Sequence, residues 1–404
     1  MENNKFWKGV ATGVLGIVSV VLFTMIVTTA TGIMDWRQIL PNAQGKVLNS
    51  ETEAKLREMQ AYIDAYYLDD IEQKQMEDSI YNGVVEGLGD DYAAYYDEEA
   101  YADLMEKTMG NYCGIGAYVS QNVTTGAITI IEPIEGSPAD KAGLQFGDVV
   151  VKVDNTDVTQ KDLSEVVSMM KGEPGTKVKL QIARQGEPEY LDIVITRAKI
   201  ESDTVDYAML DEKIGYIAVN AFEEVTKQQF RKALNELESQ GQEALIIDLR
   251  NNGGGLLDTA VDMLDRLLPE GLVVYIQDKN GKKEEYHSSE EESFNKPVVI
   301  LVNENSASAS EVFAGAMQDY DKAVLVGKKT FGKGIVQSVF QLSDGTAVKL
   351  TTSKYYTPKG RNIHGTGFEP DIEVELTEEI KEQPGSGVAV DSQMKRAIKY
   401  LQGK

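Results

Sequence analysis

Short apolar segments alternate with amphipathic ones through the second half of this chain, and this alternation limits its fold more than any other feature. Residues 244–249 and 298–302 are almost entirely apolar, which is typical of strands that are buried on both faces of a sheet. Between such segments, residues 226–239 place apolar side chains at helical spacing. Buried strands that alternate with helices predict an α/β layered core over about residues 200–375.

The elements of this core are expected in a definite order. The predicted strands and helices, in chain order, are 213–219, 226–239, 244–249, 256–268, 298–302, 308–318 and 323–326. The charged stretch 277–295 interrupts the pattern, and we interpret it as a mobile surface hairpin or lid. Near the end of the chain, Pro384 to Gly387 indicates a linker, and a last helix is predicted at 392–401.

The amino-terminal part differs from the core in its composition, because residues 10–33 carry no charged side chain. As a helix this run spans about 36 Å, enough to cross a hydrocarbon core of about 30 Å. Lys5 and Lys8 precede it, and basic residues before a span favour a cytoplasmic amino terminus. A cleaved signal peptide is the alternative, although its apolar core is usually only about 7–15 residues long. We therefore predict a cytoplasmic tail at 1–9 and a transmembrane helix at 10–34, in a single-pass protein of the cell membrane whose bulk is extracytoplasmic.

A polar segment and a helical region follow the predicted span. Residues 35–50 are interpreted as a tether, because Pro41 and Gly45 interrupt regular structure. From there to about residue 88, apolar residues recur at helical spacing, and many of them are tyrosines. This helical region, taken as 51–108, is expected to join the core or to form a homodimer, and no catalytic residue is expected in it.

Charge and composition exclude several classes of function. The net charge of −25 argues against a nucleic-acid partner, because phosphate binding requires a basic face. Cys113 is the single cysteine, so neither an internal disulfide nor a cysteine metal cluster is expected. Two histidines, His287 and His364, make a histidine metal site a poor prediction and leave few candidates for a histidine general base. No metal or other cofactor is therefore expected.

Two segments of the core carry residue types suited to acyl-transfer chemistry. Ser308 stands where a helix begins, and Glu311 completes a capping-box pattern that explains this serine structurally without any catalysis. A nucleophile at a helix start is compatible with capping, because the next N–H and the helix dipole favour negative charge there. Directly after the strand that ends at Asp248, glycines 253–255 expose bare N–H groups. A tight connection, a phosphate loop and a set of oxyanion donors are all consistent with them.

The third segment is Gly327 to Gly334, whose Lys333 lies 25 residues after Ser308. It nearly matches the nucleotide-binding pattern Gly-x-x-x-x-Gly-Lys-Ser/Thr, but Gly334 stands where a hydroxyl should bind magnesium, and a β-rich sequence follows instead of a helix. A nucleotide partner is therefore not expected. If a strand begins near Lys333, residues four apart share a face, so Gln337 points the same way and could orient the amine.

Between residues 110 and 197 the chain changes to short strand patterns with glycine turns. The segments Gly136-Ser-Pro-Ala-Asp-Lys-Ala-Gly-Leu144 and Gly147-Asp148 resemble a PDZ domain of the bacterial protease type. Such a domain binds a peptide tail, because backbone N–H groups in a glycine loop point at the terminal carboxylate while a strand edge pairs with the peptide. By this resemblance the carboxylate-binding residues are Ile115, Gly116 and Ala117.

Longer motifs extend the resemblance over about residues 50–378. They are Gly-Asp-Asp-Tyr-Ala-Ala-Tyr at 89–95, Asp-Leu-Arg-Asn-Asn-Gly-Gly-Gly at 248–255, Asn-x-x-Ser-Ala-Ser-Ala-Ser-Glu at 303–311, Val-Gly-x-x-Thr-Phe-Gly-Lys-Gly-x-Val-Gln at 326–337, and Thr-Pro-Lys-Gly-Arg-Asn-Ile-His-Gly-Thr-Gly-Phe-Glu-Pro-Asp at 357–371. With the order of domains, they resemble the serine carboxyl-terminal processing proteases, also called tail-specific proteases, of the membrane-anchored bacterial type.

The resemblance implies roles for five residues of the core. Ser308 would be the nucleophile, Lys333 its general base and Gln337 the residue that orients the lysine. The oxyanion donors would be the N–H groups of Gly254 and Ala309. A lysine base must be neutral, which requires a pKa near 7–8 instead of about 10.4, and burial lowers the pKa of an amine. Ser308 would then attack a peptide carbonyl and form an acyl-enzyme that water hydrolyses.

The implied organisation is a PDZ domain at 109–198, a serine protease core of the ClpP/crotonase-like α/β type at 199–378, and a linker with a C-terminal helix at 379–404. The expected function is that of a membrane-anchored serine endopeptidase that recognises proteins or peptides with apolar C-termini. The family also implies a resting form gated by the PDZ domain and a helical dimer. A catalytically silent PDZ scaffold and a phosphate-binding enzyme are the rival interpretations.

Overall fold

A computed structural model of the 404-residue chain describes residues 49–289, 294–377, 381–382 and 388–403. The predicted transmembrane helix at 10–34 lies outside the described residues, as does almost all of the predicted tether at 35–50. Within the described part, no helix has both the length and the apolar character that crossing a membrane requires. The chain divides into two units, Met1–Met76 and Glu77–Lys404, which are described separately.

The predicted helical region begins in the first unit with α3 (Ser50–Tyr66). The Asn49 side chain accepts the N–H groups of Glu51 and Thr52, which gives this helix a defined N-cap. No residue of α3 is buried, and its exposed large apolar side chains are Leu56, Met59, Tyr62 and Tyr66. The helical spacing of the sequence is confirmed in α3.

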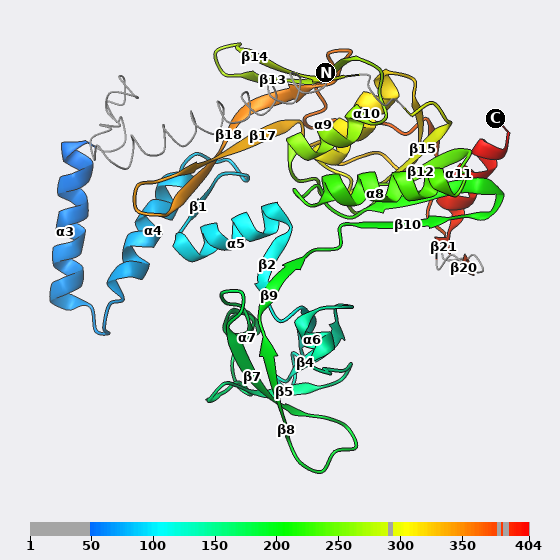
Figure 1. Ribbon diagram of the computed structural model, residues 1–404. Helices are drawn as coiled ribbons and strands as arrows, with labels where there is room; N and C mark the ends of the chain where they lie inside the picture. Colours follow the sequence, from blue (N-terminus) through cyan, green and yellow to red (C-terminus); the bar gives the residue numbers. More distant parts are fainter. Residues whose placement is uncertain (1–48, 290–293, 378–380, 383–387, 404) are drawn as a thin grey trace, which may run out of the picture. The chain divides into compact units, whose positions relative to one another are not determined.

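The second unit contains the segment predicted as a PDZ domain, which folds as an antiparallel sheet with two helices (Figure 1). The strands run in the order β3-β4-β5-β7-β8, with β6 beside β5. The elements are β3 (Ala117–Gln121), β4 (Ile128–Pro133), α6 (Pro138–Lys141), β5 (Val149–Val153), β6 (Thr156–Asp157), α7 (Leu163–Met170), β7 (Lys177–Ala183) and β8 (Leu191–Thr196). Strands and helices share one buried aliphatic core, which includes Ile130, Ala139, Val166 and Leu180.

Two strands connect this domain to the rest of the second unit. β2 (Asn111–Gly114) enters the domain and pairs antiparallel with β9 (Ala198–Glu201), which leaves it. The pairing brings both ends of the domain together, because Gly114 lies opposite Ala198. The domain is therefore an insertion on a two-stranded stem, between α5 (Glu98–Met109) and the core.

The predicted α/β core is a six-stranded sheet in the order β10-β11-β12-β15-β16-β19. All its neighbouring strands are parallel except β10 and β11. The elements are β10 (Val205–Met209), η1 (Asp211–Lys213), β11 (Ile214–Val219), α8 (Thr226–Ser239), β12 (Ala244–Asp248), α9 (Leu257–Asp265), β15 (Val298–Val302), α10 (Ala309–Asp319), β16 (Ala323–Gly327), β19 (Ile372–Glu373) and α11 (Ser392–Gln402). The predicted strands and helices are confirmed, although the helix predicted at 256–268 ends earlier, at Asp265.

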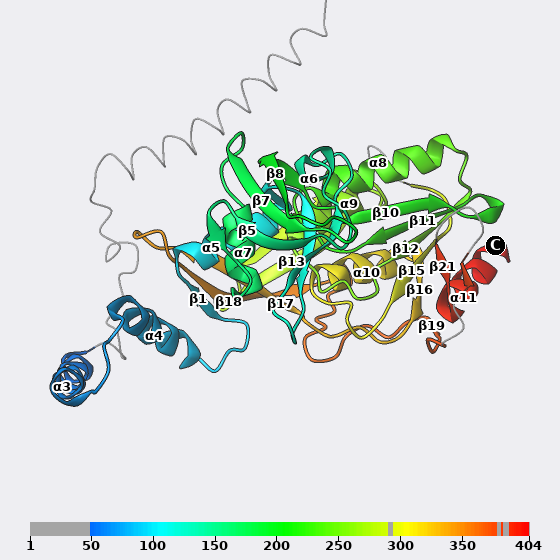
Figure 2. The same cartoon turned by 90° about the horizontal axis from the view of Figure 1, so that it is seen from below.

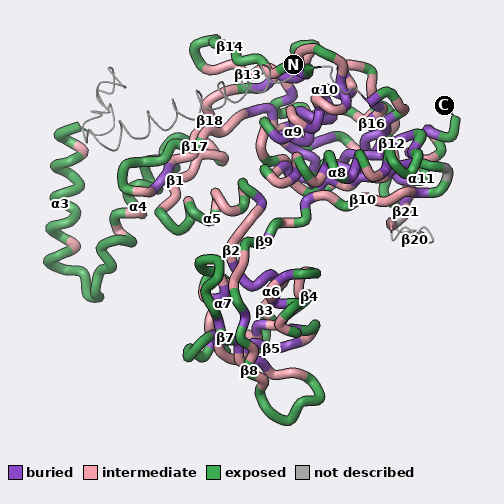
Figure 3. Tube along the Cα trace, in the orientation of Figure 1, coloured by how far each residue is buried: buried purple, intermediate pink, exposed green. Residues whose placement is uncertain are grey.

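Helices cover both faces of this sheet, which explains why its central strands are apolar throughout (Figures 2 and 3). Ile247 and Ile300 point to the face that α8, α9 and α10 cover, where they pack with Phe230 and Phe313. Their neighbours in the strands point to the opposite face, where α11 supplies Met394, Ala397 and Leu401. The two-residue repeat of a strand thus sends alternate side chains into two separate cores.

A second, antiparallel sheet holds the remaining strands in the order β1-β18-β13-β14, with β17 paired to β18. They are β1 (Ala94–Tyr96), β13 (Gly271–Asp278), β14 (Lys283–Ser288), β17 (Ile335–Gln341) and β18 (Ala347–Tyr356). The hairpin predicted within 277–295 is present as the pair β13 and β14. A short pair, β20 (Lys381–Glu382) with β21 (Ala389–Val390), precedes α11. β1 lies between α4 (Gln73–Glu86) and α5 in the chain, and it joins this sheet by pairing with β18.

Candidate active site

Ser308 occupies the turn that joins β15 to α10, and its backbone conformation is unusual. It is the N-cap residue of α10, with φ of 55° and ψ of −115°. A residue with a side chain rarely adopts a positive φ, and such strain is concentrated at functional sites. A sharp, strained turn between a strand and a helix is also how several hydrolases expose a nucleophilic serine.

The carboxylate of Glu311 connects Ser308 to the lysine segment. The predicted capping contact is present, because Glu311 Oε2 accepts the Ser308 N–H at 3.0 Å. The same carboxylate also accepts the N–H groups of Lys333 and Gly332, both at 2.8 Å, and the Thr330 hydroxyl at 2.6 Å. Glu311 is completely buried, so all four hydrogen bonds form away from bulk water. A residue that the sequence marks only as a helix cap therefore holds two distant segments together.

Tyr355 makes a second connection between the same two residues. Its hydroxyl contacts the carbonyl oxygen of Ser308 at 3.2 Å and also the carbonyl oxygen of Lys333. Only 2% of Tyr355 is exposed, and this burial, with the nearby charge of Glu311, raises the pKa of its hydroxyl well above the usual value. The hydroxyl therefore stays protonated. Glu311 therefore links the N–H groups of Ser308 and Lys333, and Tyr355 links their carbonyl groups.

The Lys333 amine is half-buried and lies 4.4 Å from the centre of the Tyr92 ring. Burial lowers the pKa of this amine, the positive charge of Lys349 lowers it further, and the negative charge of Asp90 opposes both. These directions agree with the prediction that this lysine is easier to deprotonate than an exposed one. Among the described residues, no hydrogen bond joins the Lys333 amine to the Ser308 hydroxyl.

The glycines that flank Lys333 lie very close to another part of the backbone. A Cβ at Gly334 would lie 2.5 Å from the His364 N, and a Cβ at Gly332 would lie 2.9 Å from the Gly367 N. The glycines make room for the backbone of residues 363–367, which packs against the lysine segment.

The strand on which the placement of Gln337 depends begins later than expected. β17 begins at Ile335, after Lys333, and its pairing with β18 shifts between Val336 and Gln337. The extra residue of this irregularity is Thr352 in β18, so β17 itself alternates without interruption, but it begins two residues after Lys333 and its alternation does not include the lysine. The Gln337 amide donates to the Thr351 hydroxyl at 3.3 Å. Its predicted action on the lysine stays a prediction.

The triple-glycine turn lies against the nucleophile segment. Gly254 has a φ of 102°, and a Cβ there would lie 2.7 Å from the Ala307 carbonyl oxygen, 2.8 Å from the Ser308 Cβ and 2.9 Å from the Ala309 N. Only glycine fits this position. The Gly254 N–H donates to the Asn252 side chain at 2.8 Å. Ala309 is the first residue of α10, where an N–H has no partner within the helix.

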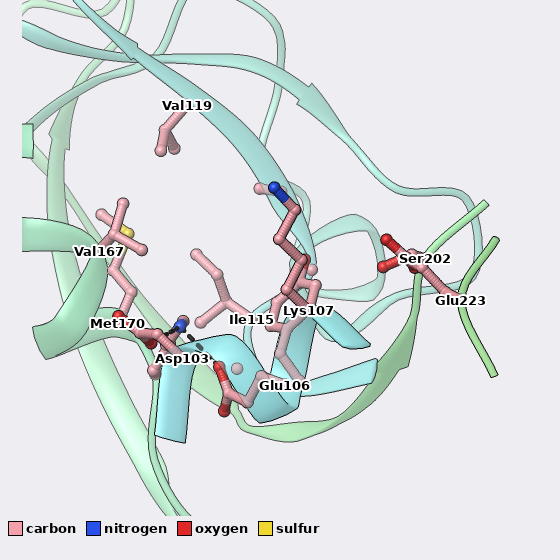
Figure 4. A pocket seen from close by; sticks show the side chains of 14 residues that line it. Asp103, Glu106, Lys107, Ile115, Val119, Val167, Met170, Ser202 and Glu223 are labelled. Atoms are coloured by element: carbon pink, nitrogen blue, oxygen red, sulfur yellow. Dashed lines mark hydrogen bonds and ion pairs between the residues drawn. The ribbon is translucent and has the colours of Figure 1, made fainter. Parts of the chain in front are cut away.

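The PDZ segment contains a cavity of about 350 Å³ between β3 and α7, close to α5 (Figure 4). The predicted carboxylate-binding residues Ile115, Gly116 and Ala117 all line it. Gly116 has a φ of 77°, and its carbonyl accepts the Ser137 hydroxyl at 2.8 Å. The apolar part of the wall is formed by the side chains of Ile115, Val119, Val167 and Met170.

One end of this cavity is charged. Lys171, which follows α7, pairs with Glu106 at 2.6 Å and with Asp103 at 2.9 Å, and both acids belong to α5 (Figure 4). Burial lowers the pKa of Lys171, but the hydrogen bonds and charges of Glu106 and Asp103 together outweigh this effect and raise it. The cavity thus combines an apolar wall and a glycine loop with two lysines, Lys107 and Lys171, and three acids, Asp103, Glu106 and Glu223. An apolar wall beside a glycine loop suits a short apolar peptide that ends in a carboxylate.

Comparisons with known proteins agree with this arrangement. Residues 213–374 match the model of peptidase family S41, and residues 129–184 match the PDZ domain model. A probable CtpA-like serine protease of Staphylococcus epidermidis is 38% identical over 368 residues, which cover 89% of this chain and 72% of that protein. The carboxy-terminal processing protease CtpA of Bacillus subtilis is 34% identical over 359 residues, with coverage of 86% and 76%.

The chain belongs to peptidase family S41. The resemblance found in the motifs is confirmed, and the protein is a serine-type, C-terminal processing peptidase with a PDZ domain. Its α/β core corresponds to the segment that matches the S41 model.

In this S41 peptidase, the loop before the glycines has an anchor that the sequence does not reveal. The guanidinium of Arg250 binds both oxygens of Asp248 and also donates to Asp391 at 2.6 Å, across 141 positions of sequence. Asp391 is also the N-cap of α11, because it accepts the Met394 N–H. Arg250, Asp391, Tyr355 and the bridging function of Glu311 all depend on partners far away in sequence, so no local pattern could have identified them.

Proposed function

We propose that this S41 peptidase is a membrane-anchored endopeptidase that binds substrate C-termini in its PDZ cavity and cleaves with Ser308 as nucleophile and Lys333 as general base. The observation that carries the proposal is the double connection between these two residues. Glu311 joins their N–H groups and Tyr355 their carbonyl groups, so the two segments keep one mutual geometry. The lowered pKa of the Lys333 amine supports its part in the chemistry.

In the proposed reaction the neutral Lys333 amine takes the proton of the Ser308 hydroxyl as the oxygen attacks the substrate carbonyl carbon. The tetrahedral intermediate collapses, the C–N bond breaks, and the proton passes from the lysine to the leaving amine. Water then attacks the resulting ester with Lys333 again as base, which releases the new carboxyl terminus and restores Ser308. Gln337 is proposed to orient the lysine from its place beside Thr351.

The N–H groups of Gly254 and Ala309 are the proposed oxyanion donors. Ala309 is well suited, since a free N–H at the start of α10 coincides with the positive end of the helix dipole. Gly254 must first release the Asn252 side chain, or share its N–H with it, before it can donate to substrate. We therefore propose that productive binding is accompanied by a local rearrangement of the glycine turn.

The PDZ cavity is the proposed site for the substrate tail. An apolar final side chain would contact Val119, Val167 and Met170, and the terminal carboxylate would lie at the loop of Ile115, Gly116 and Ala117. Membrane attachment through residues 10–34 and a homodimer through the helical region are proposed on the sequence pattern, with the exposed apolar side chains of α3 as further support for the dimer. No nucleotide, nucleic acid or metal takes part in the proposed reaction.

Tail recognition can be tested by changing either the substrate or the cavity. Full-length protein in detergent is incubated with an unstructured protein that ends in an apolar tail, either as the free acid or as the amide. We expect amidation to raise KM about tenfold or more, because the loop loses its carboxylate. We expect Val167→Asp to raise KM for the free acid in the same way, because a new carboxylate would face an apolar tail.

Val194→Asp is the matched control, since Val194 is 55% exposed on the same domain and does not line the cavity. It should leave KM unchanged. Equal cleavage of amidated and free tails, together with an unaffected Val167→Asp variant, would show that the PDZ cavity does not select substrates. The cleavage reaction itself would remain measurable in that case, so tail recognition and catalysis are tested separately.

A further inference from the structure

The turn that contains Asp90 and Tyr92 lies in the helical region, from which no catalytic contribution was expected. It belongs to the motif at 89–95, which the proposed reaction does not use. β1 follows the turn directly and pairs with β18, where Ala94 lies opposite Lys349. β18 also pairs with β17, the strand that follows Lys333. Strand pairing therefore brings this turn to the lysine segment.

Tyr92 is in direct contact with the proposed base, since its ring centre lies 4.4 Å from the Lys333 amine. The turn that holds Tyr92 is itself well ordered by hydrogen bonds. The Tyr92 N–H donates to Asp90 Oδ1 at 3.0 Å, and Asp90 also accepts the hydroxyl of Thr351, which lowers the pKa of this carboxylate. The same Thr351 hydroxyl accepts the Gln337 amide. Tyr92 and Gln337 thus belong to one connected set of contacts around Lys333.

The other charged and titratable groups near the amine come from several elements. Asp90 and Lys349 act on it through their charges, with opposite effects. Lys349 is itself covered by Tyr96, whose ring centre lies 5.3 Å from its amine. Tyr355 and Glu311 contact the backbone of Lys333. The aromatic ring of Tyr92 lies over the Lys333 amine, so removal of this ring would expose the amine to water.

We propose that Tyr92 is a positioning residue for the catalytic base: its ring covers the Lys333 amine, keeps water from it and holds it in the site. The inference rests on the proposed role of Lys333. An amine shielded from water is easier to deprotonate, because water stabilises the charged form. When Lys333 takes the Ser308 proton, the face of the ring attracts the new ammonium group, which by itself raises the pKa of the amine. We expect the shielding to outweigh this attraction, because burial is the largest cause of the lowered pKa of Lys333.

The test is the pH dependence of kcat/KM for full-length enzyme and its variants, with one substrate throughout. Activity requires the neutral amine, so it is lost as the pH falls through the pKa of Lys333. Tyr92→Ala is expected to move this acid limb about one unit to higher pH, with about a tenfold loss of activity at neutral pH that alkaline pH partly restores. Tyr92→Phe keeps the ring and should leave the limb in place.

Tyr95→Ala is the control for a merely structural effect. Tyr95 lies in β1, three residues after Tyr92, but packs against Tyr81, with ring centres 5.3 Å apart. It should lower the unfolding temperature without moving the acid limb. An unmoved limb in Tyr92→Ala, or an equal movement in Tyr95→Ala, would overturn the inference.

A second readout does not depend on activity. In the Ser308→Ala background, the rate at which an amine-acylating reagent modifies Lys333 is followed by mass spectrometry as a function of pH. The midpoint should rise in Tyr92→Ala, and an unchanged midpoint would contradict the proposal. If Lys333→Ala keeps full activity, the proposed base is wrong. If Lys333→Ala is inactive while Tyr92→Ala behaves like the wild type, only the inference on Tyr92 fails.

Discussion

Replacing Ser308 or Lys333 with alanine is expected to lower kcat by about four orders of magnitude or more, and the double variant should be no slower than either single one. The reason is that nucleophile and base act as one unit, so that removing either group removes the whole covalent route. The measurement is single-turnover cleavage of an unstructured protein. A serine-directed phosphonylating reagent should label the wild-type protein at Ser308 and label the lysine variant far more slowly.

Lys329→Ala is the matched control for the lysine. Lys329 lies in the same segment, but its amine forms an ion pair with Glu369 at the surface, so its loss should leave kcat unchanged. The wild-type profile should show activity that rises with pH to a plateau, with a midpoint below the ordinary pKa of lysine, because burial and Lys349 lower the pKa of Lys333. Substantial cleavage by the serine or lysine variant, or strongly additive effects in the double variant, would contradict the Ser–Lys mechanism.

The second large effect is expected for Glu311→Gln, a change that keeps the shape and removes the charge. Glu311 accepts four hydrogen bonds in a fully buried place, and an amide would turn its NH2 group toward some of those donors. Each hydrogen bond to a charged group is worth about 1.5–3 kcal/mol, and a buried donor without a partner is costly. We expect kcat to fall about a hundredfold and the unfolding temperature to fall by roughly 5 °C or more.

Asp319→Asn separates the effect on catalysis from the effect on stability. Asp319 is a second buried carboxylate of the same helix, α10, and it binds Arg361 and the Lys359 N–H at the opposite end. It should lower the unfolding temperature to a similar extent and leave kcat nearly unchanged below that temperature. If both variants lose kcat in proportion to their loss of stability, Glu311 has only a structural role.

The sequence predicted most reliably the strands, helices and turns that depend on neighbouring residues and on burial. The strand at Val298–Val302 is completely buried, as its unbroken apolar composition indicated, and α8 and α10 were recognisable from their spacing and caps. The PDZ domain was equally evident, because turns that require glycine recur at positions such as Gly116 and Gly147, both of which have positive φ. These features are local in the chain, so a pattern of neighbouring residues is enough to specify them.

Strand register and long-range contacts are the features that the sequence did not reveal. Gln337 was placed by strict alternation along a strand, but β17 begins later and contains an irregular pairing with β18. The helical region was set aside as packing, yet the pairing of β1 with β18 brings Tyr92 against Lys333. A strand of three residues has too little pattern to reveal its partner, and a shift of one residue in register reverses every side chain.

By itself, the sequence determined that this chain has an α/β core, a PDZ domain and an uncharged amino-terminal run, and it singled out Ser308 and Lys333 by their motifs. Only the tertiary structure decided how these two residues are held, because Glu311 reaches the Lys333 N–H across 22 positions of the chain, and Tyr355 reaches the carbonyl groups of Lys333 and Ser308 across 22 and 47 positions. Hydrophobic patterns and turn-forming residues depend on residues that are neighbours in the chain, so they can be identified from the sequence. A hydrogen bond between distant segments exists only after the sheets have brought them together.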